Sequence, residues 1–479
     1  MATEQKNYDL AVIGAGSGGV RAARMAAAHG AKVALFEKKH LGGTCVNVGC
    51  VPKKLMVYAA GFRHEFEDAQ GFGWSVGKTE HDWSKLISNK DTEIERLRGI
   101  YGTLLKDVEV FEGHARFEDL NTLEVDGKRI KADKILIATG GKPRMPDIPG
   151  KEYFSSSDDM FYLDTLPEHI TIYGGGYIAA EFANIMHGLG SEVSLHYRGT
   201  MFLRHFDDDI SLHLADEYRK QGINLQFSSE IEEIQKKENG RFCVKTTKKE
   251  ESETDLVLAA TGRIANIDDL NMQNFGFEMT DDGLLKVNEQ FQTSHPHIYA
   301  VGDIINTMQL TPVAIAQAHY LADTLFAPKD QARHPYPNLE CIPTAVFSNP
   351  PIGTVGMTEH EARDKFGDDN VICFPARFRA MKFTLPDRDE KTVMKLIVLK
   401  DSHRVVGIHM CGHDAPEIIQ GFALAIDKGA TKEDFDRMIG IHPTSGEEFF
   451  TMRTPSLATP AKDENKSDLQ KAKKKTKTY

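Results

Sequence analysis

The sequence predicts an α/β protein of several domains, in which two domains are parallel sheets covered by helices and a third is an antiparallel α+β domain. Three observations support this fold class. The chain has 479 residues, which exceeds the usual size of one hydrophobic core. A strand, glycine turn, helix and strand occur in that order twice, about 160 residues apart. The C-terminal third instead contains alternating apolar runs such as VMKLIVL and RVVGIHM, which are typical of antiparallel strands.

The composition is that of an ordinary globular protein. Hydrophobic residues make up 41% of the chain and charged residues 27%. No stretch approaches the 18 apolar residues of a membrane span, and a net charge of −12 argues against nucleic acid as a partner. The first residues, MATEQKNYDL, lack the basic start and apolar centre of a signal peptide, and six cysteines are too few for a secreted disulfide scaffold. We therefore expect a cytoplasmic protein without a membrane partner.

The first glycine pattern follows an apolar strand at residues 10–13. It reads Gly14-x-Gly16-x-x-Gly19 and opens an alanine-rich helix. Glycines at these places allow a tight turn and bring a pyrophosphate close to the helix N-terminus. Glu37 ends the next strand, 23 residues after Gly14, where a carboxylate accepts hydrogen bonds from an adenosine ribose. A bare glycine turn is the alternative, but the strand, helix and acid in register predict a Rossmann-like dinucleotide site.

The second glycine pattern has a basic residue where the first has an acid. Gly174, Gly176 and Ala179 occupy the glycine places. Arg198 lies 24 residues after Gly174, and Arg204 follows six residues later. A carboxylate would repel the 2′-phosphate of NADPH, whereas guanidinium groups bind it in charge-assisted pairs. Two solvated surface arginines are the alternative; the spacing favours a second Rossmann-like domain that binds a different nucleotide.

Three more predicted strands end in a glycine turn. They are ILIATGG at 135–141, LVLAATGR at 256–263 and HIYAVGDI at 297–304, and the first two support an internal duplication. Asp303, in the third, is placed to bind a ribityl hydroxyl of a cofactor or to cap the helix that begins near Thr311.

The motif GGTCVNVGCVPKK places Cys45 and Cys50 five positions apart. Metal ligands, a structural cross-link, a buried pair and a redox couple are the alternatives. Zinc needs four ligands, and no second cluster of cysteine and histidine supplies the others. A disulfide requires the chain to turn between the two residues. Pro52 fits the first turn of a helix that begins just after Cys50, and its positive end, with the two lysines that follow, favours a thiolate.

Taken in order, these motifs and the segment HPTSGEE resemble the FAD-dependent pyridine nucleotide–disulfide reductases, and within that family the glutathione reductases. The resemblance extends from residue 8 to about residue 453. It implies FAD and NADPH as cofactors, a homodimer, and reduction of glutathione disulfide to two glutathiones, which maintains cellular thiol redox balance. It also implies an FAD-binding domain at 1–143, an NADPH-binding domain at 144–264, a central FAD-contacting segment at 265–336, a dimerisation domain at 337–458, and a disordered basic tail at 459–479.

The resemblance implies a role for the cysteines. Electrons pass from NADPH through FAD to a redox-active Cys45–Cys50 disulfide. Cys50 is the proximal thiolate, and Cys45 attacks the substrate and forms a mixed disulfide. Lys53 and Glu181 match the family's ion pair near the flavin, and Tyr177 matches the residue that gates the nicotinamide pocket.

A proton donor is implied in the segment IGIHPTSGEEFF. His442 matches the family's acid, and Glu447 holds its tautomer. Glu447 also completes a capping box with Thr444, which is the alternative role for it. In the family this histidine comes from the partner subunit, so the active site is shared across the dimer.

The remaining predicted site residues bind the cofactors and the substrate, and no metal site is expected. For FAD they are Gly14, Gly16, Ser17, Gly18, Gly19, Glu37, Gly43, Thr44, Thr139, Gly140, Arg263, Asp303 and Thr311. For NADPH they are Gly174, Gly176, Ile178, Ala179, Arg198, Arg204 and Gly262. For the substrate they are Arg21, Arg24 and Tyr101.

One departure from the family concerns the substrate. Thr324 stands where many glutathione reductases have an arginine, and Arg21 is an additional basic residue that compensates. A related disulfide, such as a glutathione amide or a trypanothione-like compound, and a dihydrolipoamide dehydrogenase-like activity are the alternatives. The absence of any cysteine after Cys411 disfavours thioredoxin and mercuric reductases.

Overall fold

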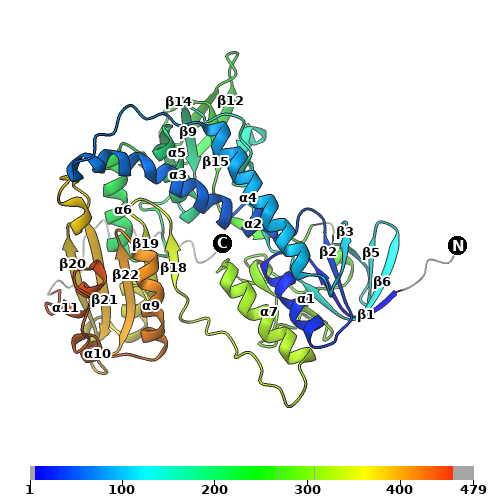
Figure 1. The fold of residues 1–479 in the computed structure, drawn as a ribbon. Coiled ribbons are helices and arrows are strands. Elements are labelled where there is room, and N and C mark those ends of the chain that lie inside the picture. Colours follow the sequence, from blue (N-terminus) through cyan, green and yellow to red (C-terminus); the bar gives the residue numbers. More distant parts are fainter. Residues whose placement is uncertain (1–5, 269, 307, 457–479) are drawn as a thin grey trace.

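The computed structural model describes residues 6–268, 270–306 and 308–456 of the chain. It contains a sheet with helices α1 and α7 at one end, a second sheet with α5 in the middle, and an antiparallel sheet with α9 at the other end (Figure 1). The basic tail predicted at 459–479 lies outside the described residues.

The first sheet has the strand order β3-β2-β1-β6-β5-β4, and β17 pairs with β6. Its inner strands pair in parallel, and β4 and β5 are antiparallel. Both faces of β1 are buried, because Leu10 and Val12 pack in one core cluster and Ala11 and Ile13 in another. Helices α1 (Ser17–Ala28) and α7 (Thr311–Phe326) pack together beside this sheet (Figure 1). The strands are β1 (Lys6–Ile13), β2 (Val33–Glu37), β3 (Glu109–Glu112), β4 (Arg116–Asp119), β5 (Thr122–Val125), β6 (Lys128–Ile137) and β17 (Ile298–Ala300).

The second sheet repeats the first at its centre. The strand, helix and strand β9, α5 and β10 repeat β1, α1 and β2, and the strand order is β11-β10-β9-β15-β8 with parallel pairing. A three-stranded antiparallel sheet, β12-β13-β14, and a two-stranded one, β16-β7, accompany it. The elements are β7 (Gly141–Pro143), β8 (Phe154–Ser155), β9 (His169–Tyr173), α5 (Tyr177–Leu189), β10 (Glu192–Tyr197), α6 (Asp208–Gln221), β11 (Asn224–Phe227), β12 (Ile231–Lys236), β13 (Phe242–Thr246), β14 (Glu251–Thr254), β15 (Leu256–Ala259) and β16 (Arg263–Ala265).

The third sheet is antiparallel, in the order β18-β19-β22-β21-β20. Its inner strands β21 and β22 are almost entirely buried, because α9 covers one face and α6 approaches the sheet as well. The elements are β18 (Thr344–Val346), β19 (Ile352–Gly356), α8 (Glu359–Phe366), β20 (Val371–Phe378), β21 (Thr392–Leu399), β22 (Val405–Cys411), α9 (Ala415–Asp427), α10 (Lys432–Asp436) and α11 (Glu448–Thr451).

Three helices link these units. α2 (Gly43–Asn47) and α3 (Cys50–Ala69) follow the first strand–helix–strand pattern, and α4 (Trp83–Leu104) packs on both. α3 also packs on α5. The mixed α/β class with a C-terminal α+β sheet is confirmed, and the domain boundaries stay a prediction. In the described part of the chain, no helix has both the length and the apolar character needed to cross a membrane.

Candidate functional site

The two cysteines lie together at the junction of α2 and α3. Gly49 lets the chain fold back between them, because a Cβ there would lie 2.8 Å from the carbonyl oxygen of Thr44 and 3.2 Å from the Cα of Cys45. Cys45 is half-buried, Cys50 is exposed, and both are free thiols. The first turn of α3 begins at Cys50, so this sulfur lies at the positive end of a 20-residue helix.

The thiols differ in acidity. The pKa of Cys50 is lowered to about 6, chiefly by the hydrogen bond from Cys45 and further by Lys53 and Thr311, which together outweigh the partial desolvation of the sulfur. The pKa of Cys45 is raised, because its proton is held in the hydrogen bond to Cys50 and because the thiol is buried. The pair therefore holds one negative charge, on Cys50, and one proton, on Cys45.

A hydroxyl contact and a nearby positive charge act on Cys50. The Oγ1 of Thr311, at the start of α7, lies 4.0 Å from the Cys50 sulfur and 3.4 Å from the Oγ of Ser17, at the start of α1. Lys53, one turn along α3, donates from Nζ to the Oε1 of Glu181 at 2.7 Å. The site thus joins the N-terminal ends of α1, α3 and α7.

Glu181 is a buried carboxylate that connects three elements. Its side chain, 3% exposed, accepts from Lys53 on α3 and from the backbone N of Phe347, 2.9 Å away after β18. The Lys53 ammonium also lies 4.3 Å from the ring centroid of Phe347. The ion pair predicted from the sequence is present, and Phe347 is a member that the sequence did not indicate.

Tyr177 begins α5 close to this cluster. Burial raises its pKa well above the usual value, and the nearby carboxyls of Glu181 and Asp303 act in the same direction, whereas Arg263 opposes them. Arg263 donates from Nη2 to the carbonyl of Gly141 at 2.6 Å. The structure therefore places Tyr177 between the second glycine turn and the cysteine pair.

The two glycine turns open helices that have no side-chain cap. α1 and α5 have Gly16 and Gly176 as N-cap residues, with no side-chain hydrogen bond to their first N–H groups and no acidic residue in the first turn. α6, α8 and α10 are capped by Asp207, Thr358 and Thr431. Uncapped N–H groups at a glycine turn bind phosphate oxygens.

Arg198 and Arg204 are exposed and lie next to the second turn. Arg198 follows β10 directly, and the segment between them is tied to the turn by the N–H of Leu203, which donates to the carbonyl of Gly175 at 2.6 Å. Within the described ranges, neither arginine forms a salt bridge, and Arg204 donates from Nε to the neighbouring His205. Both guanidinium groups are thus available to an anion.

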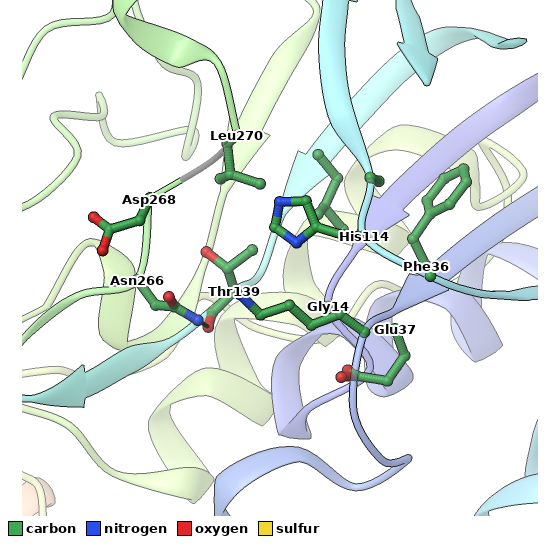
Figure 2. Close-up of a pocket in the computed structure, with 12 residues that line it drawn as sticks. Gly14, Phe36, Glu37, His114, Thr139, Asn266, Asp268 and Leu270 are labelled. Atoms are coloured by element: carbon green, nitrogen blue, oxygen red, sulfur yellow. Dashed lines mark hydrogen bonds between the residues drawn. The ribbon is translucent and has the colours of Figure 1, made fainter. Parts of the chain in front are cut away.

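A pocket opens at the carboxyl ends of β1, β2, β3 and β6, where parallel sheets bind ligands. Figure 2 shows Glu37, Thr139, Asn266 and His114 around it. Glu37 accepts from the backbone N of Ala15 at 2.8 Å, which orients the carboxylate toward the first glycine turn. This geometry suits the ribose of a dinucleotide.

The residues present fit FAD. The Oγ1 of Thr139 is buried, and the described part of the chain offers it no hydrogen-bond partner. A buried hydroxyl left unpaired costs about 1–3 kcal/mol, which a bound cofactor would recover. Gly14 (φ +100°) and Gly43 (φ +59°) leave room for a backbone approach, because a Cβ on Gly43 would lie 2.6 Å from the Cα of Gly16. Gly140 and Asp303 lie at the ends of the neighbouring strands β6 and β17.

Asp303 does not cap a helix. α7 has Leu310 at its N-cap with no side-chain hydrogen bond, so the capping alternative for Asp303 is wrong. The Asp303 carboxyl lies in a short 3₁₀ turn, and burial raises its pKa. Asp303 therefore remains a candidate ligand of the cofactor.

The predicted substrate residues gather near Cys45. Burial and the charge of Cys45 raise the pKa of Tyr101, and Arg21 and Arg24 partly offset them, so all three groups lie close enough to act on Tyr101. In the described part of the chain neither arginine is in a salt bridge. Thr324 lies on α7, which packs on the arginine-bearing α1, and its buried Oγ1 has no partner among the described residues.

His442 and Glu447 contact each other but not the cysteines of the same chain. The Nδ1 of His442 lies 3.0 Å from the Oε1 of Glu447, and Glu447 also caps the turn at Thr444, so both contacts expected of Glu447 are present. His442 is 82% exposed, and Ile439 and Ile441 beside it are 91% and 79% exposed. In Figure 1, α11 and α2 lie well apart.

Some pocket residues were not predicted from the sequence. His114, Asn266 and Asp268 line the cavity with Glu37. The signal for His114 was present, since it follows β3, a parallel strand of the first sheet, whereas Asn266 follows β16 of the separate two-stranded sheet. Outside this pocket, Asp158 also has a buried oxygen without a partner in the described residues, and the charge of Arg263 acts on its carboxyl.

Known proteins resemble this chain over nearly its whole length. Residues 8–318 match the model of the pyridine nucleotide-disulphide oxidoreductase family, and residues 342–453 match its dimerisation domain. The chain belongs to this family. It is 47% identical to glutathione reductase of Burkholderia cepacia over 453 residues, which cover 94% of this chain and 99% of the relative.

Two further relatives agree with this membership. The chloroplastic/mitochondrial glutathione reductase of Pisum sativum is 46% identical over 94% of this chain and 83% of its own length. Glutathione reductase of Nostoc sp. is 45% identical over 93% of this chain and 99% of its own length. Membership implies an oxidoreductase that uses FAD and NADPH and carries a dimerisation domain.

Proposed function

We propose that this chain reduces glutathione disulfide with NADPH, through FAD and the Cys45–Cys50 pair, as a cytoplasmic homodimer. One observation carries the choice of substrate: Cys45, Arg21 and Arg24 all act electrostatically on Tyr101, and the two arginines have no salt-bridge partner among the described residues. Glutathione disulfide bears four carboxylates against two amines, so such a cationic entrance attracts it. The relatives' names agree with this substrate.

The protein's own groups divide the thiol chemistry between them. FAD, held at the first glycine turn beside Glu37 and Thr139, would supply hydride acceptance from NADPH and the two electrons that open the Cys45–Cys50 disulfide. Cys50 then carries the negative charge, stabilised by Lys53, Thr311 and the N-terminus of α3. Cys45 retains the proton, so it needs a base before it attacks a disulfide.

The substrate is reduced in two exchange steps. The Cys45 thiolate attacks one sulfur of glutathione disulfide, forms a mixed disulfide and releases one glutathione thiolate. The Cys50 thiolate then attacks the Cys45 sulfur, which releases the second glutathione and restores the Cys45–Cys50 disulfide. The imidazole of His442, with Glu447 at Nδ1, takes the proton of Cys45 and returns it to the departing thiolate.

His442 comes from the partner subunit in this proposal. Its exposure, the exposed isoleucines beside it and the separation of α11 from α2 support a site completed by a second copy. Arg198 and Arg204 bind the 2′-phosphate of NADPH, and the uncapped start of α5 binds the pyrophosphate.

A panel of disulfides tests the substrate. The purified holoenzyme is given glutathione disulfide, trypanothione disulfide, glutathione amide disulfide or lipoamide, with NADPH or NADH, and nicotinamide absorbance is followed. We expect the highest kcat/KM for glutathione disulfide with NADPH. A higher value for another disulfide would reject this substrate, and equal use of NADH would reject the role of the two arginines.

A further inference from the structure

A buried group of charged side chains joins the arginine-bearing segment of the nucleotide site to the third sheet. Lys395 on β21 is 3% exposed, and its Nζ donates to both carboxylate oxygens of Asp207, at 2.9 and 3.2 Å, and to Asp209 at 2.7 Å. Glu359, at the start of α8, pairs with the same ammonium, and its backbone N donates to Asp207 at 3.1 Å. We call these four residues the Lys395 cluster.

The cluster keeps a buried carboxylate ionised. Burial acts to raise the pKa of Asp207, but Lys395 holds it below the usual value. Burial acts to lower the pKa of Lys395, but Asp207, Asp209 and Glu359 raise it above the usual value. Asp207 is 1% exposed, so removal of Lys395 would leave a buried charge without its main partner.

Asp207 is the last anchor of the segment at 198–206. Its carboxylate accepts from the backbone N of Asp209 at 3.1 Å and so caps α6. The segment is held at two other places: the N–H of Leu203, in the left-handed region at φ +55°, donates to Gly175, and the carbonyl of Gly199 accepts from Ser228 at 2.8 Å.

Arg204 lies between two of these anchors. Leu203, before it, is tied to the glycine turn of the nucleotide site, and Asp207, three residues after it, is tied to Lys395 on the third sheet. The Arg204 side chain is exposed, and the hydrogen bond described for it joins it to the adjacent His205 on the same segment, so its position depends on where that segment runs. The path of the backbone on both sides of Arg204 therefore sets the direction of its side chain.

We propose that Lys395 is a positioning residue for the nucleotide, which through Asp207 holds the segment at 198–206 so that Arg204 meets the 2′-phosphate of NADPH. The inference rests on the proposed function of Arg198 and Arg204. It means that the sheet of the dimerisation domain takes part in the choice between NADPH and NADH, although Lys395 contacts neither nucleotide.

The first experiment compares three single variants of the FAD-loaded homodimer. Lys395→Met removes the charge and keeps the length, Lys395→Arg keeps the charge, and Lys432→Met removes another buried lysine of the same domain, one that pairs with Asp436 on α10. The readout is the ratio of kcat/KM for NADPH to that for NADH. Lys395→Met should lower it roughly 3- to 30-fold through KM for NADPH, Lys395→Arg should retain most of it, and Lys432→Met should leave it unchanged.

Binding without turnover supplies a second readout. Calorimetry gives the dissociation constants of 2′,5′-ADP and 5′-AMP, which differ by the 2′-phosphate. Lys395→Met should raise the dissociation constant of 2′,5′-ADP by a similar factor and leave that of 5′-AMP little affected. Equal weakening of both fragments would mean that the whole domain has loosened, which overturns the positioning role.

The Arg198→Met/Arg204→Met variant separates the inference from the proposed function. If this variant keeps the NADPH/NADH ratio, the proposed function of the arginines fails, and the inference fails with it. If it lowers the ratio but Lys395→Met does not, only the inference is overturned. Lys395→Met added to the arginine variant should cause no further fall, because the arginines carry its effect; an additive loss overturns the inference.

One more variant covers the case in which Lys395→Met does not fold. Asp207→Asn combined with Lys395→Met removes the stranded charge, and asparagine still caps α6. This double variant should fold and bind FAD, with the NADPH/NADH ratio lowered. A ratio equal to that of the parent protein would overturn the inference.

Discussion

At the scale of single residues, the placement of one proton divides the work of the two cysteines. The Cys45 thiol donates to Cys50, so the same hydrogen bond lowers the pKa of one group and raises that of the other. Lys53 and Thr311 reinforce the charge on Cys50. Two identical side chains five positions apart thereby become a stable thiolate and a thiol that depends on a base.

The absorbance of the flavin–thiolate pair tests this division. Cys45→Ser should keep a long-wavelength charge-transfer band, and Cys50→Ser should abolish it. Because the pKa of Cys50 is lowered to about 6, the thiolate is present above that pH and is lost as the pH falls through it. The band of the two-electron-reduced parent protein should therefore fade with a midpoint near pH 6. The reverse pattern in the two variants would exchange the proximal and distal assignments.

Single residues also determine which substrate charge the site prefers. Arg21 and Arg24, three positions apart on one face of α1, lie near Cys45 and should attract an anionic disulfide. Arg24→Ala should lower kcat/KM for glutathione disulfide, and Arg21→Glu should narrow its preference over the cationic trypanothione disulfide. Both effects should weaken with salt, which screens charges over about 10 Å at 0.1 M. An unmoved preference in Arg21→Glu would contradict the electrostatic account.

At the scale of elements, the glycine turns were predictable because their reasons are local. Gly19 must lack a side chain, since a Cβ would lie 1.8 Å from the carbonyl of Gly14. The strand, turn and acid that reveal this motif lie within 30 residues of each other. Phe347 and the Lys395 cluster were missed for the opposite reason: Phe347 is 166 positions from Glu181, and Lys395 is 188 positions from Asp207. No local sequence pattern indicates partners that are so far apart along the chain.

The close approach at Gly19 gives a prediction about FAD retention. Gly19→Ala should push α1 away from the end of β1 and weaken FAD binding, seen as loss of bound flavin on gel filtration. The matched control is Gly99→Ala in α4, where a Cβ meets nothing within 4 Å. That change should keep FAD and raise stability by about 0.5–1 kcal/mol. Full flavin content in Gly19→Ala would show that the turn tolerates a shift of the helix.

At the scale of the whole molecule, one chain holds both halves of the proposed site but does not bring them together. The cysteine pair, its lysine and the substrate arginines are on the first half of the chain, and the His442–Glu447 pair is in the dimerisation domain. The sequence predicted both halves, because each is a local motif. In the proposed function their assembly depends on a second copy, and the exposed surface around His442 supports this proposal.

Mixed dimers test whether the site is shared. Cys45→Ser and His442→Ala homodimers should each be nearly inactive, since each lacks one half of both sites. After subunit exchange, a dimer with one copy of each variant has one site that combines an intact Cys45 with an intact partner His442. That site should restore up to half of the parent activity per mixed dimer, because the second site lacks both groups. Exchange is verified with two affinity tags, and activity is measured on the doubly tagged fraction. If that fraction stays inactive, His442 does not serve Cys45 of the other subunit, and a movement within one chain would have to bring α11 to α2.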